Sequence, residues 1–315
     1  KIVVTISDKN GQPSYRISYK DTPFINSSSL GLITNIGDFS REMSLEHDVQ
    51  SNRIDETYTL PNIKQSNVHY VATEGIYRFS QQGKMIYDVI FRVSDRDVAF
   101  KYKMYPQKNT LSCIVKEEAT SFVLPDGSTT FLCPQSKPMG GFARTSPSYE
   151  TPYKADDTMG KNGWGEGYTF PCLFRIDDAG WVLVSETGVD SRYCGSRLSD
   201  VSEGNLYTVA FPMPEENNGN GTVAPAFALP GATPWRTITV GETLKPIVET
   251  TVPWDVVNPL YETKHDYRFG RGTWSWILWQ DGSINYDDQM RYIDFAAAMG
   301  YEYALIDNWW DTNIG

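Results

Sequence analysis

Residues 267–311 constrain the fold of this chain most, because they have the pattern of a strand, a loop, a helix and a second strand. The run Thr273–Trp279 is apolar and aromatic, as in a buried parallel strand. Asn285 is placed to cap the helix that follows, and Gly300 is placed to end it. The second strand is expected over Tyr303–Ile306. This is the repeating unit of a (β/α)8 barrel, which needs eight such units and about 250 residues, so the barrel is predicted to be incomplete in this chain.

The helix of this unit is expected to pack through one apolar face and to carry ion pairs on its surface. Asp287 and Arg291 are four residues apart and are predicted to pair. The predicted apolar face comprises Tyr286, Met290, Ile293 and Ala297.

The first domain, residues 1–240, is predicted to be almost entirely β. Short alternating runs are separated by turn residues, and hairpins are expected to turn at 94–97 and at 177–180. Many short strands with regular turns indicate a large sandwich. Residues 241–266, with three prolines, are predicted to link it to the start of the barrel at 267–315.

Composition excludes several classes of protein. The net charge of −11 argues against a nucleic-acid partner, since phosphate binding needs a basic surface. No apolar run has transmembrane length, so membrane insertion is not expected. The 4 cysteines lack the paired spacing of a zinc site, and the 3 histidines are scattered. The start at Lys1 without a leader fits a mature periplasmic or secreted protein, and equally a chain expressed without its leader.

Four segments occur in a recognisable order from the end of the β domain onward. They are TPWRTITVG at 233–241, NPL at 258–260, GRGTWSW at 270–276 and YIDFAAAMGYEYALID at 292–307. In this order they resemble glycoside hydrolase family 97, and the resemblance covers essentially the whole chain. It implies an N-terminal β-super-sandwich, a catalytic (β/α)8 barrel of the TIM type and a C-terminal β domain. It also implies a calcium-dependent, periplasmic, exo-acting α-glucosidase or α-galactosidase that removes terminal α-linked sugars from oligosaccharides.

The resemblance also indicates where the catalytic groups lie. The paired carboxylates of the family are on later barrel strands and loops, so no catalytic residue is assigned in this chain. A glutamate of the N-terminal domain helps to bind calcium, and the segment Tyr149–Tyr153 resembles its motif. Glu150 is therefore the first candidate for a calcium ligand, with Glu166 as the alternative; carboxylate oxygens suit this ion. The competing interpretation is that Glu150 is a solvated loop acid.

Four further residues are candidates for binding the sugar. Trp274 and Trp276 are two apart on the predicted strand and should face the same way, either toward a sugar ring or into the packed interior. Asp307 ends the second strand, and strand ends face the active site in such barrels. Trp309 lies just beyond it. Arg236, in the TPWRT motif, is expected to anchor the sandwich to the linker.

Two other classes of function remain open from the sequence. The chain can be a non-catalytic carbohydrate-binding sandwich, or a structural domain without a ligand. As an enzyme it needs the remainder of the barrel as a partner, and the choice between glucose and galactose is left open.

Overall fold

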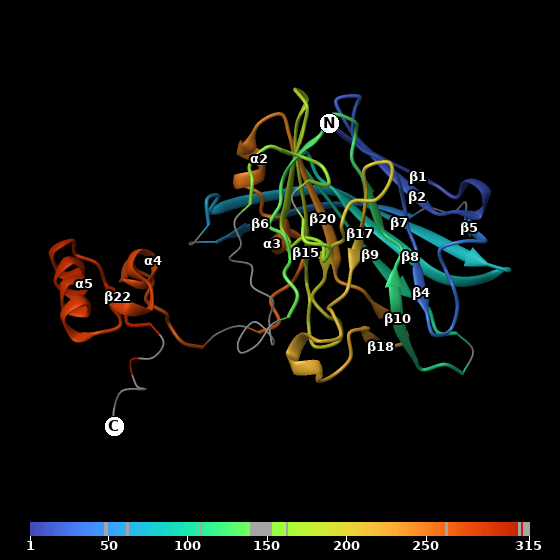
Figure 1. Cartoon of the computed structure of the whole chain (residues 1–315). Helices are drawn as coiled ribbons and strands as arrows, with labels where there is room; N and C mark the ends of the chain where they lie inside the picture. Colours follow the sequence, from blue (N-terminus) through green and yellow to red (C-terminus); the bar gives the residue numbers. More distant parts are fainter. Residues whose placement is uncertain are drawn as a thin grey trace. The chain divides into compact units, whose positions relative to one another are not determined.

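The structure is a computed structural model of the chain (Figure 1). It describes residues 1–46, 50–60, 63–107, 109–138, 153–161, 163–261, 264–307 and 310. The chain forms two compact units, residues 1–258 and residues 259–315.

The first unit is a β-sandwich built on one large antiparallel sheet. Its eleven strands follow the order β13-β12-β14-β15-β20-β9-β8-β7-β5, with β19 beside β9 and β6 beside β7. The strands are β5 (Met43–Leu45), β6 (Gln50–Thr59), β7 (Asn67–Gln81), β8 (Lys84–Val93), β9 (Asp97–Met104), β12 (Thr129–Phe131), β13 (Asp157–Thr158), β14 (Cys172–Ile176), β15 (Gly180–Thr187), β19 (Gly231–Ala232) and β20 (Trp235–Gly241). Both predicted hairpins are confirmed, as β8–β9 and β14–β15.

Three small sheets form the other side of the sandwich, in the orders β1-β2-β3, β18-β10-β4 and β11-β17-β16. Their strands are β1 (Ile2–Ser7), β2 (Ser14–Tyr19), β3 (Thr22–Ser29), β4 (Leu32–Thr34), β10 (Ser112–Glu118), β11 (Ser121–Val123), β16 (Arg197–Leu198), β17 (Leu206–Ala210) and β18 (Ala226–Ala228). Short 3-10 turns are η1 (Lys9–Gly11) and η2 (Glu216–Gly219). The amide of Ser29 donates to Ser121 Oγ at 2.7 Å, which joins the edges of two of these sheets.

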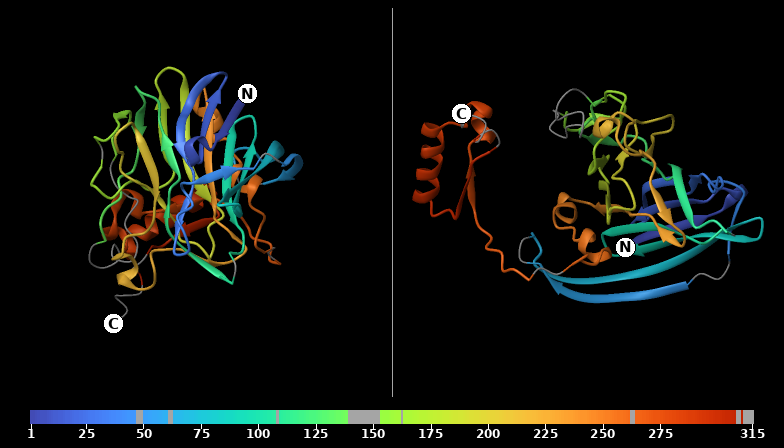
Figure 2. Two further views of the ribbon diagram at one scale, coloured as in Figure 1. Left: turned by 90° about the vertical axis from the view of Figure 1, so that its right-hand side faces the viewer. Right: turned by 90° about the horizontal axis from the view of Figure 1, so that it is seen from below.

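The core lies between the two sides. Alternate residues of β14 and β15 are buried, as expected for strands with one face inward. Buried tyrosine hydroxyls join segments that pack around the core: Tyr15 of β2 donates to Ser121 O of β11 at 2.9 Å, and Tyr87 of β8 donates to Phe39 O at 3.0 Å. These bonds satisfy polar groups that burial would otherwise leave unpaired. Figure 2 shows the long strands β6 and β7 curving together along one side of the sandwich.

Two short helices, α2 (Leu244–Val248) and α3 (Val252–Val256), lie inside the segment predicted as a linker. Both belong to the first unit, which ends at Asn258. Val252 and Val256 of α3 pack with Trp235 and Ala99 in a small cluster of their own. All seven residues of β20 are therefore buried, because the sandwich core covers one face and these helices pack on the other.

The second unit is a parallel strand–helix–strand. It contains β21 (Gly272–Trp274), α4 (Trp276–Trp279), η3 (Asp281–Ser283), α5 (Tyr286–Ala298) and β22 (Tyr303–Leu305). Strands β21 and β22 pair in parallel, with Trp274 opposite Leu305. Asn285 caps α5 by accepting from the Asp288 amide at 3.0 Å, and Gly300 follows the helix with φ of +65°. The predicted fold class, a β-sandwich followed by the first βαβ unit, is confirmed.

Three local predictions for this unit were wrong. The strand expected over Thr273–Trp279 ends at Trp274, because Ser275 is tied into a buried turn and the chain continues as α4. Arg291 pairs with Asp288, at 3.3 Å, and not with Asp287. The helix face turned inward carries Gln289 and Ala296, whereas the predicted apolar face is largely exposed. The two strands cover only a narrow part of α5, which leaves the predicted apolar face of this helix largely exposed.

Candidate functional site

The carboxyl ends of β21 and β22 bring two of the predicted residues together. Trp274 is the last residue of β21, and Asp307 follows two residues after β22. The indole Nε1 of Trp274 donates to Asp307 Oδ2 at 2.7 Å. Asp307 is half-buried, and the Trp274 side chain is 38% exposed. An indole N–H on a carboxylate is a charge-assisted hydrogen bond, which is stronger than a neutral one.

A second tryptophan packs against the first. The rings of Trp274 and Trp276 stack with centroids 5.8 Å apart and planes at 19°. We predicted that the two side chains face the same way because they lie two apart on one strand. That reason was wrong, since Trp276 begins α4. The Trp276 indole donates to Asp281 Oδ1 at 2.8 Å. Each indole of the pair therefore binds an aspartate, and one face of the Trp274 ring is covered.

The turn between β21 and α5 is held by a buried polar network. Ser275 and Ser283 share a hydrogen bond of 2.8 Å, and Gln289 of α5 donates to Ser275 Oγ at 2.7 Å. Ser283 also donates to the carbonyl of Gln280 at 2.8 Å. Gln280 has φ of +56° and ψ of −160°, a backbone region that is essentially restricted to glycine. The network thus holds a strained loop at the carboxyl end of β21, which no spacing rule in the sequence had indicated.

Of the two predicted calcium ligands, Glu166 is the one that lies among the described residues. Glu150, like Trp309, lies outside them. Glu166 Oε1 pairs with Lys137 Nζ at 3.1 Å, and its side chain is 17% exposed. Over the part of the chain that the structure describes, no three His, Cys, Asp or Glu side chains gather closely enough to hold a metal ion. Glu166 can offer one carboxylate, and one carboxylate does not fit the six to eight oxygen ligands that calcium takes.

Arg236 has a different place from the one predicted. Its guanidinium binds Glu118 through two hydrogen bonds of 2.8 and 2.6 Å, and it also binds Glu186. The Arg236 and Glu118 side chains have no exposed surface. Burial alone would lower the pKa of Arg236, but the two carboxylates raise it above its usual range. The residue holds the interior of the sandwich together and does not anchor the linker.

The linker is anchored by a second polar cluster. Arg96 donates to Thr251 Oγ1 at 2.9 Å, and Thr250 donates to the buried Asp97 at 2.8 Å. Tyr58 and Thr251 both donate to Asp255 of α3. The sequence gives no local signal for this cluster, because its members come from segments far apart in the chain.

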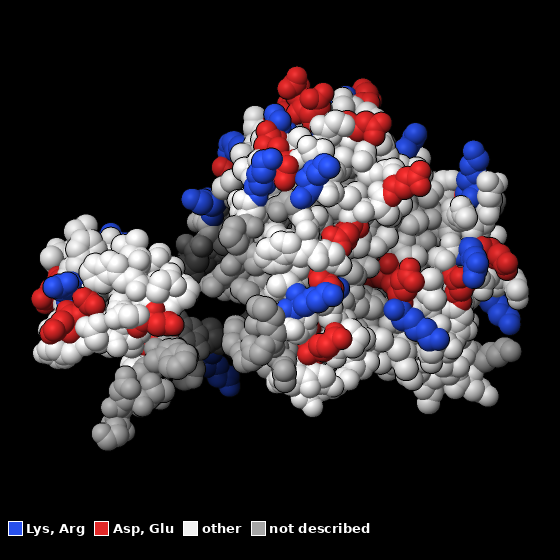
Figure 3. All heavy atoms as spheres, viewed as in Figure 1, with Lys and Arg blue, Asp and Glu red and all other residues white. Residues whose placement is uncertain are grey.

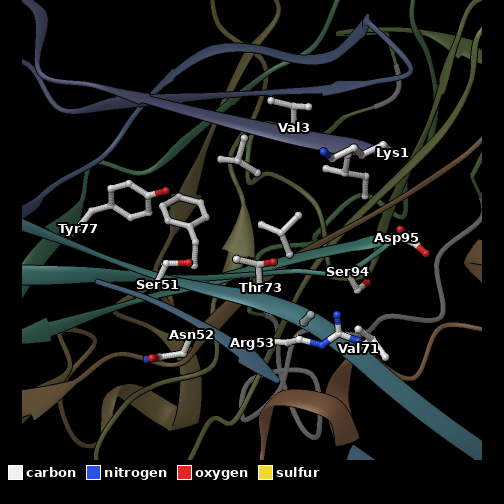
Figure 4. Close-up of a pocket in the computed structure, with 16 residues that line it drawn as sticks. Lys1, Val3, Ser51, Asn52, Arg53, Val71, Thr73, Tyr77, Ser94 and Asp95 are labelled. Carbon is white, nitrogen blue, oxygen red and sulfur yellow. The ribbon is translucent and has the colours of Figure 1, made fainter. Parts of the chain in front are cut away.

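A groove of about 560 Å³ opens in the first unit (Figure 4). It lies between β1, the edge strand of its sheet, and the strands β6, β7 and β8. Figure 4 shows Tyr77 at one end, Lys1 and Val3 along one side, and Ser51 and Thr73 opposite. Apolar and polar side chains both line it, as in many small-molecule pockets.

The sequence also argued against a nucleic-acid partner, a zinc site built from cysteines and insertion into a membrane. On the face shown in Figure 3, acidic and basic side chains of the first unit are interspersed. The four cysteines are free thiols, and burial raises the pKa of Cys113 and Cys194 to about 11, which disfavours a reactive thiolate. Among the described residues, no helix is both long and apolar enough to cross a membrane.

Comparisons with known proteins now define the class. The glycosyl-hydrolase 97 N-terminal family matches residues 1–259, so the sandwich is the N-terminal domain of a glycoside hydrolase. The chain belongs to glycoside hydrolase family 97.

Three relatives show how much of such a protein is present. A crystal structure of a β-arabinopyranosidase is 66% identical, with a TM-score of 0.91 over 100% of this chain and 50% of its own. A probable retaining α-galactosidase of Streptomyces bingchenggensis is 25% identical over 95% of this chain and 43% of its own length. A family 97 enzyme of a Pseudoalteromonas species, solved in complex with panose, shares the fold at 23% identity and a TM-score of 0.76, over 98% of this chain and 47% of its own. The chain spans about half the length of these relatives.

Proposed function

We propose that this chain belongs to an exo-acting glycoside hydrolase that removes terminal β-L-arabinopyranose or α-D-galactose from oligosaccharides. The observation that carries the proposal is the 66% identity to a β-arabinopyranosidase over the whole chain. The second support is the relative named as a probable retaining α-galactosidase. An α-glucosidase activity, which the sequence left equally open, is less favoured by these two names.

The two sugars have closely related shapes. A β-L-arabinopyranoside has the ring configuration of an α-D-galactopyranoside and lacks only the hydroxymethyl group at carbon 5. One set of hydrogen bonds to the ring hydroxyls can therefore serve both sugars. Discrimination between them then depends on the space beside carbon 5, and a difference of one small group is worth only about 1–3 kcal/mol.

The mechanism is proposed only as far as this chain allows. Glycosidases use a pair of carboxyl groups, one as acid and one as base or nucleophile. We assign neither role within residues 1–315. Asp307 and Trp274, and with them Trp276 and Trp309, are proposed to contact or position the sugar at the barrel mouth.

Calcium dependence and a periplasmic or secreted location are part of the proposal. Glu150, with Glu166 as the alternative, would supply one carboxylate to the ion. The other oxygens must come from elsewhere, because the described residues offer no cluster for it. A bound divalent cation would stabilise negative charge near the leaving oxygen.

The test uses the full-length gene product and three chromogenic glycosides. Nitrophenyl β-L-arabinopyranoside and α-D-galactopyranoside should be hydrolysed, and nitrophenyl α-D-glucopyranoside should be hydrolysed much more slowly. A chelator should abolish turnover, and added calcium should restore it. Rapid hydrolysis of the glucoside alone would contradict the sugar assignment, and activity that is indifferent to chelator would contradict the metal assignment.

The groove of the first unit favours one alternative, a non-catalytic carbohydrate-binding module. Tyr77 supplies an aromatic ring there, and Ser51 and Thr73 supply hydroxyls. Calorimetry on the full-length protein with oligosaccharides separates the two functions. Binding without turnover that is lost in Tyr77→Ala would support the binding module, whereas turnover unaffected by Tyr77→Ala would support the enzyme.

A further inference from the structure

We propose that Trp274 is a positioning residue that orients the Asp307 carboxylate to accept hydrogen bonds from ring hydroxyls of the terminal sugar. The inference rests on the proposed function, because it concerns the same barrel mouth. It changes the role expected for Trp274, which the sequence suggested as a platform for stacking on the sugar.

The first step is the location of the pair. β21 and β22 are adjacent parallel strands, and Trp274 and Asp307 lie at their carboxyl ends. In barrels built from this unit, the carboxyl ends of the strands carry the residues that meet the substrate. The 2.7 Å bond therefore joins two side chains on the face where sugar is expected.

The second step is the chemistry of the two groups. An indole N–H only donates, and here it donates to Asp307. It therefore has no acceptor to offer a sugar hydroxyl. A carboxylate has about four lone-pair sites, so Asp307 can accept from Trp274 and from sugar hydroxyls together. Of this pair, the aspartate is suited to contact the sugar, and the tryptophan is suited to hold it.

The third step is the packing of Trp274. One face of its ring is stacked on Trp276, which is itself bound to Asp281. The buried bonds among Ser275, Ser283 and Gln289 fix the turn that carries Trp276. A side chain supported in this way cannot turn freely, so the direction of its N–H, and with it the orientation of Asp307, is set before sugar arrives. Such preorganisation reduces the cost of binding.

The experiment is a double-mutant cycle in the full-length protein. The variants are Trp274→Phe, Asp307→Asn and their combination, with Trp254→Phe as the matched control; Trp254 is 46% exposed and has no part in the proposed site. Trp274→Phe keeps the ring stack and removes the N–H, whereas Trp254→Phe removes an indole N–H from α3 of the first unit and leaves the Trp274–Asp307 bond in place. Each variant is assayed for KM and kcat on the β-L-arabinopyranoside and α-D-galactopyranoside, and for binding of free L-arabinose and D-galactose by calorimetry.

Asp307→Asn should weaken sugar binding and raise KM about tenfold or more, as expected for a hydrogen bond to a charged group. Trp274→Phe should raise KM about 5- to 20-fold with a smaller change in kcat. The double variant should be no worse than Asp307→Asn, because Trp274 acts only through the aspartate. Trp254→Phe should leave KM unchanged, because the Trp274–Asp307 bond is kept.

A further measurement keeps the test valid if Trp274→Phe does not fold. In 15N-tryptophan-labelled protein, the indole N–H resonance of Trp274 should shift in Asp307→Asn and on addition of the monosaccharide. An indole resonance that is indifferent to both would overturn the positioning role.

The outcomes separate this inference from the proposed function. Additive effects of Trp274→Phe and Asp307→Asn, or an unchanged KM in Trp274→Phe, would overturn the positioning role while hydrolysis still supports the enzyme. Monosaccharide binding that depends on both residues, without hydrolysis, would overturn the enzyme and support the positioning. A protein that neither binds nor hydrolyses these sugars would overturn both.

Discussion

Arg236 is a fully buried cation between two glutamates, and its replacement should destabilise the sandwich strongly. Glu118 is buried with it and accepts two of its hydrogen bonds. Arg236→Met leaves that carboxylate without its countercharge in the core, which should cost about 3–5 kcal/mol. Urea unfolding of the chain, followed by circular dichroism, measures the loss.

Arg192 provides the control for this prediction. It pairs with Asp190 at the surface, where its side chain is 74% exposed. Arg192→Met should move the unfolding midpoint very little, because exposed ion pairs contribute little. Equal losses in the two variants would show that charge removal in general, and not burial, is responsible.

Asp97 should give the sandwich an unusual dependence on pH. Burial raises the pKa of this carboxyl above its usual 3.8, although hydrogen bonds from Thr239 and Thr250 act in the opposite direction. The folded state therefore holds the proton more tightly than the unfolded state. Ionisation of Asp97 therefore destabilises the folded state. This loss of stability is complete once pH has risen through the folded pKa, and it disappears as pH falls below 3.8. Asp97→Asn should thus gain stability relative to the parent as pH rises from 3 to 7.

Asp190 should show the opposite sign. Its hydrogen bonds with Arg192 lower its pKa below 3.8, so the stability it contributes is present above that pH and is lost as pH falls through the folded pKa. Asp190→Asn should therefore lose stability relative to the parent as pH rises. Chemical denaturation at several pH values checks both slopes, and two slopes of the same sign would contradict the assignment to burial and pairing.

At the level of single residues, the sequence could indicate Asp307 because the end of a strand is a local feature. Gly300, the strand after it and Asp307 follow one another closely in the sequence, and the structure places Asp307 just after that strand. The partner of Arg236 could not be found in this way, since Glu118 lies 118 residues away. Pairing across a core depends on the register of many strands, and a single sequence does not specify that register.

Among the elements, the β14–β15 hairpin offers a test of close packing. Gly180 begins β15 with φ of +145°, and a Cβ there would lie 2.3 Å from the carbonyl oxygen of Gly241 in β20. Gly127 also has a positive φ, of +81°, but its Cβ would meet no atom within 4 Å. Both alanine variants carry backbone strain, so their difference measures the clash. Gly180→Ala should be less stable than Gly127→Ala by about 1–3 kcal/mol in urea unfolding.

Equal stabilities of these two variants would mean that β15 and β20 can separate slightly without loss. Hydrogen exchange of the amides of β20 would then show the opening, since their protection depends on the pairing of β15 with β20.

Element by element, prediction succeeded where the signal is local. Hairpin turns, the Asn285 cap and the Gly300 stop are each fixed by a few neighbouring residues. The prediction of a strand over Thr273–Trp279 was wrong because aromatic residues occur in both strands and helices. The strand ends where Ser275 bonds to residues of the next turn and of α5. The helices α2 and α3 were missed because each contains a proline, which the prediction took as the sign of a linker.

For the whole molecule, the two units differ in how well each covers its own apolar surface. The first unit encloses a continuous core with large aromatic residues that have almost no exposure. The second unit leaves large apolar side chains open: Ile277, Leu278, Trp279, Tyr286, Phe295, Met299, Tyr303, Leu305 and Ile306 are each at least 44% exposed. Monomeric proteins rarely leave so many large apolar side chains of one short segment uncovered. Further polypeptide is therefore expected on it, and later strands of a barrel would supply that cover.

Residues 1–258 should consequently fold without residues 259–315, and the reverse should not hold. Deleting 259–315 should leave the urea midpoint of the sandwich unchanged and should lower the binding of a hydrophobic dye, because the exposed apolar surface is removed. In the 315-residue chain, limited proteolysis should cut within 259–315 first, whereas in the full-length gene product the same bonds should resist. As a control, cleavage within 1–258 should proceed equally slowly in all three proteins. A monomeric 315-residue chain whose tail resists protease would contradict this prediction, since two strands and two helices would then be stable without the cover that the exposed surface requires.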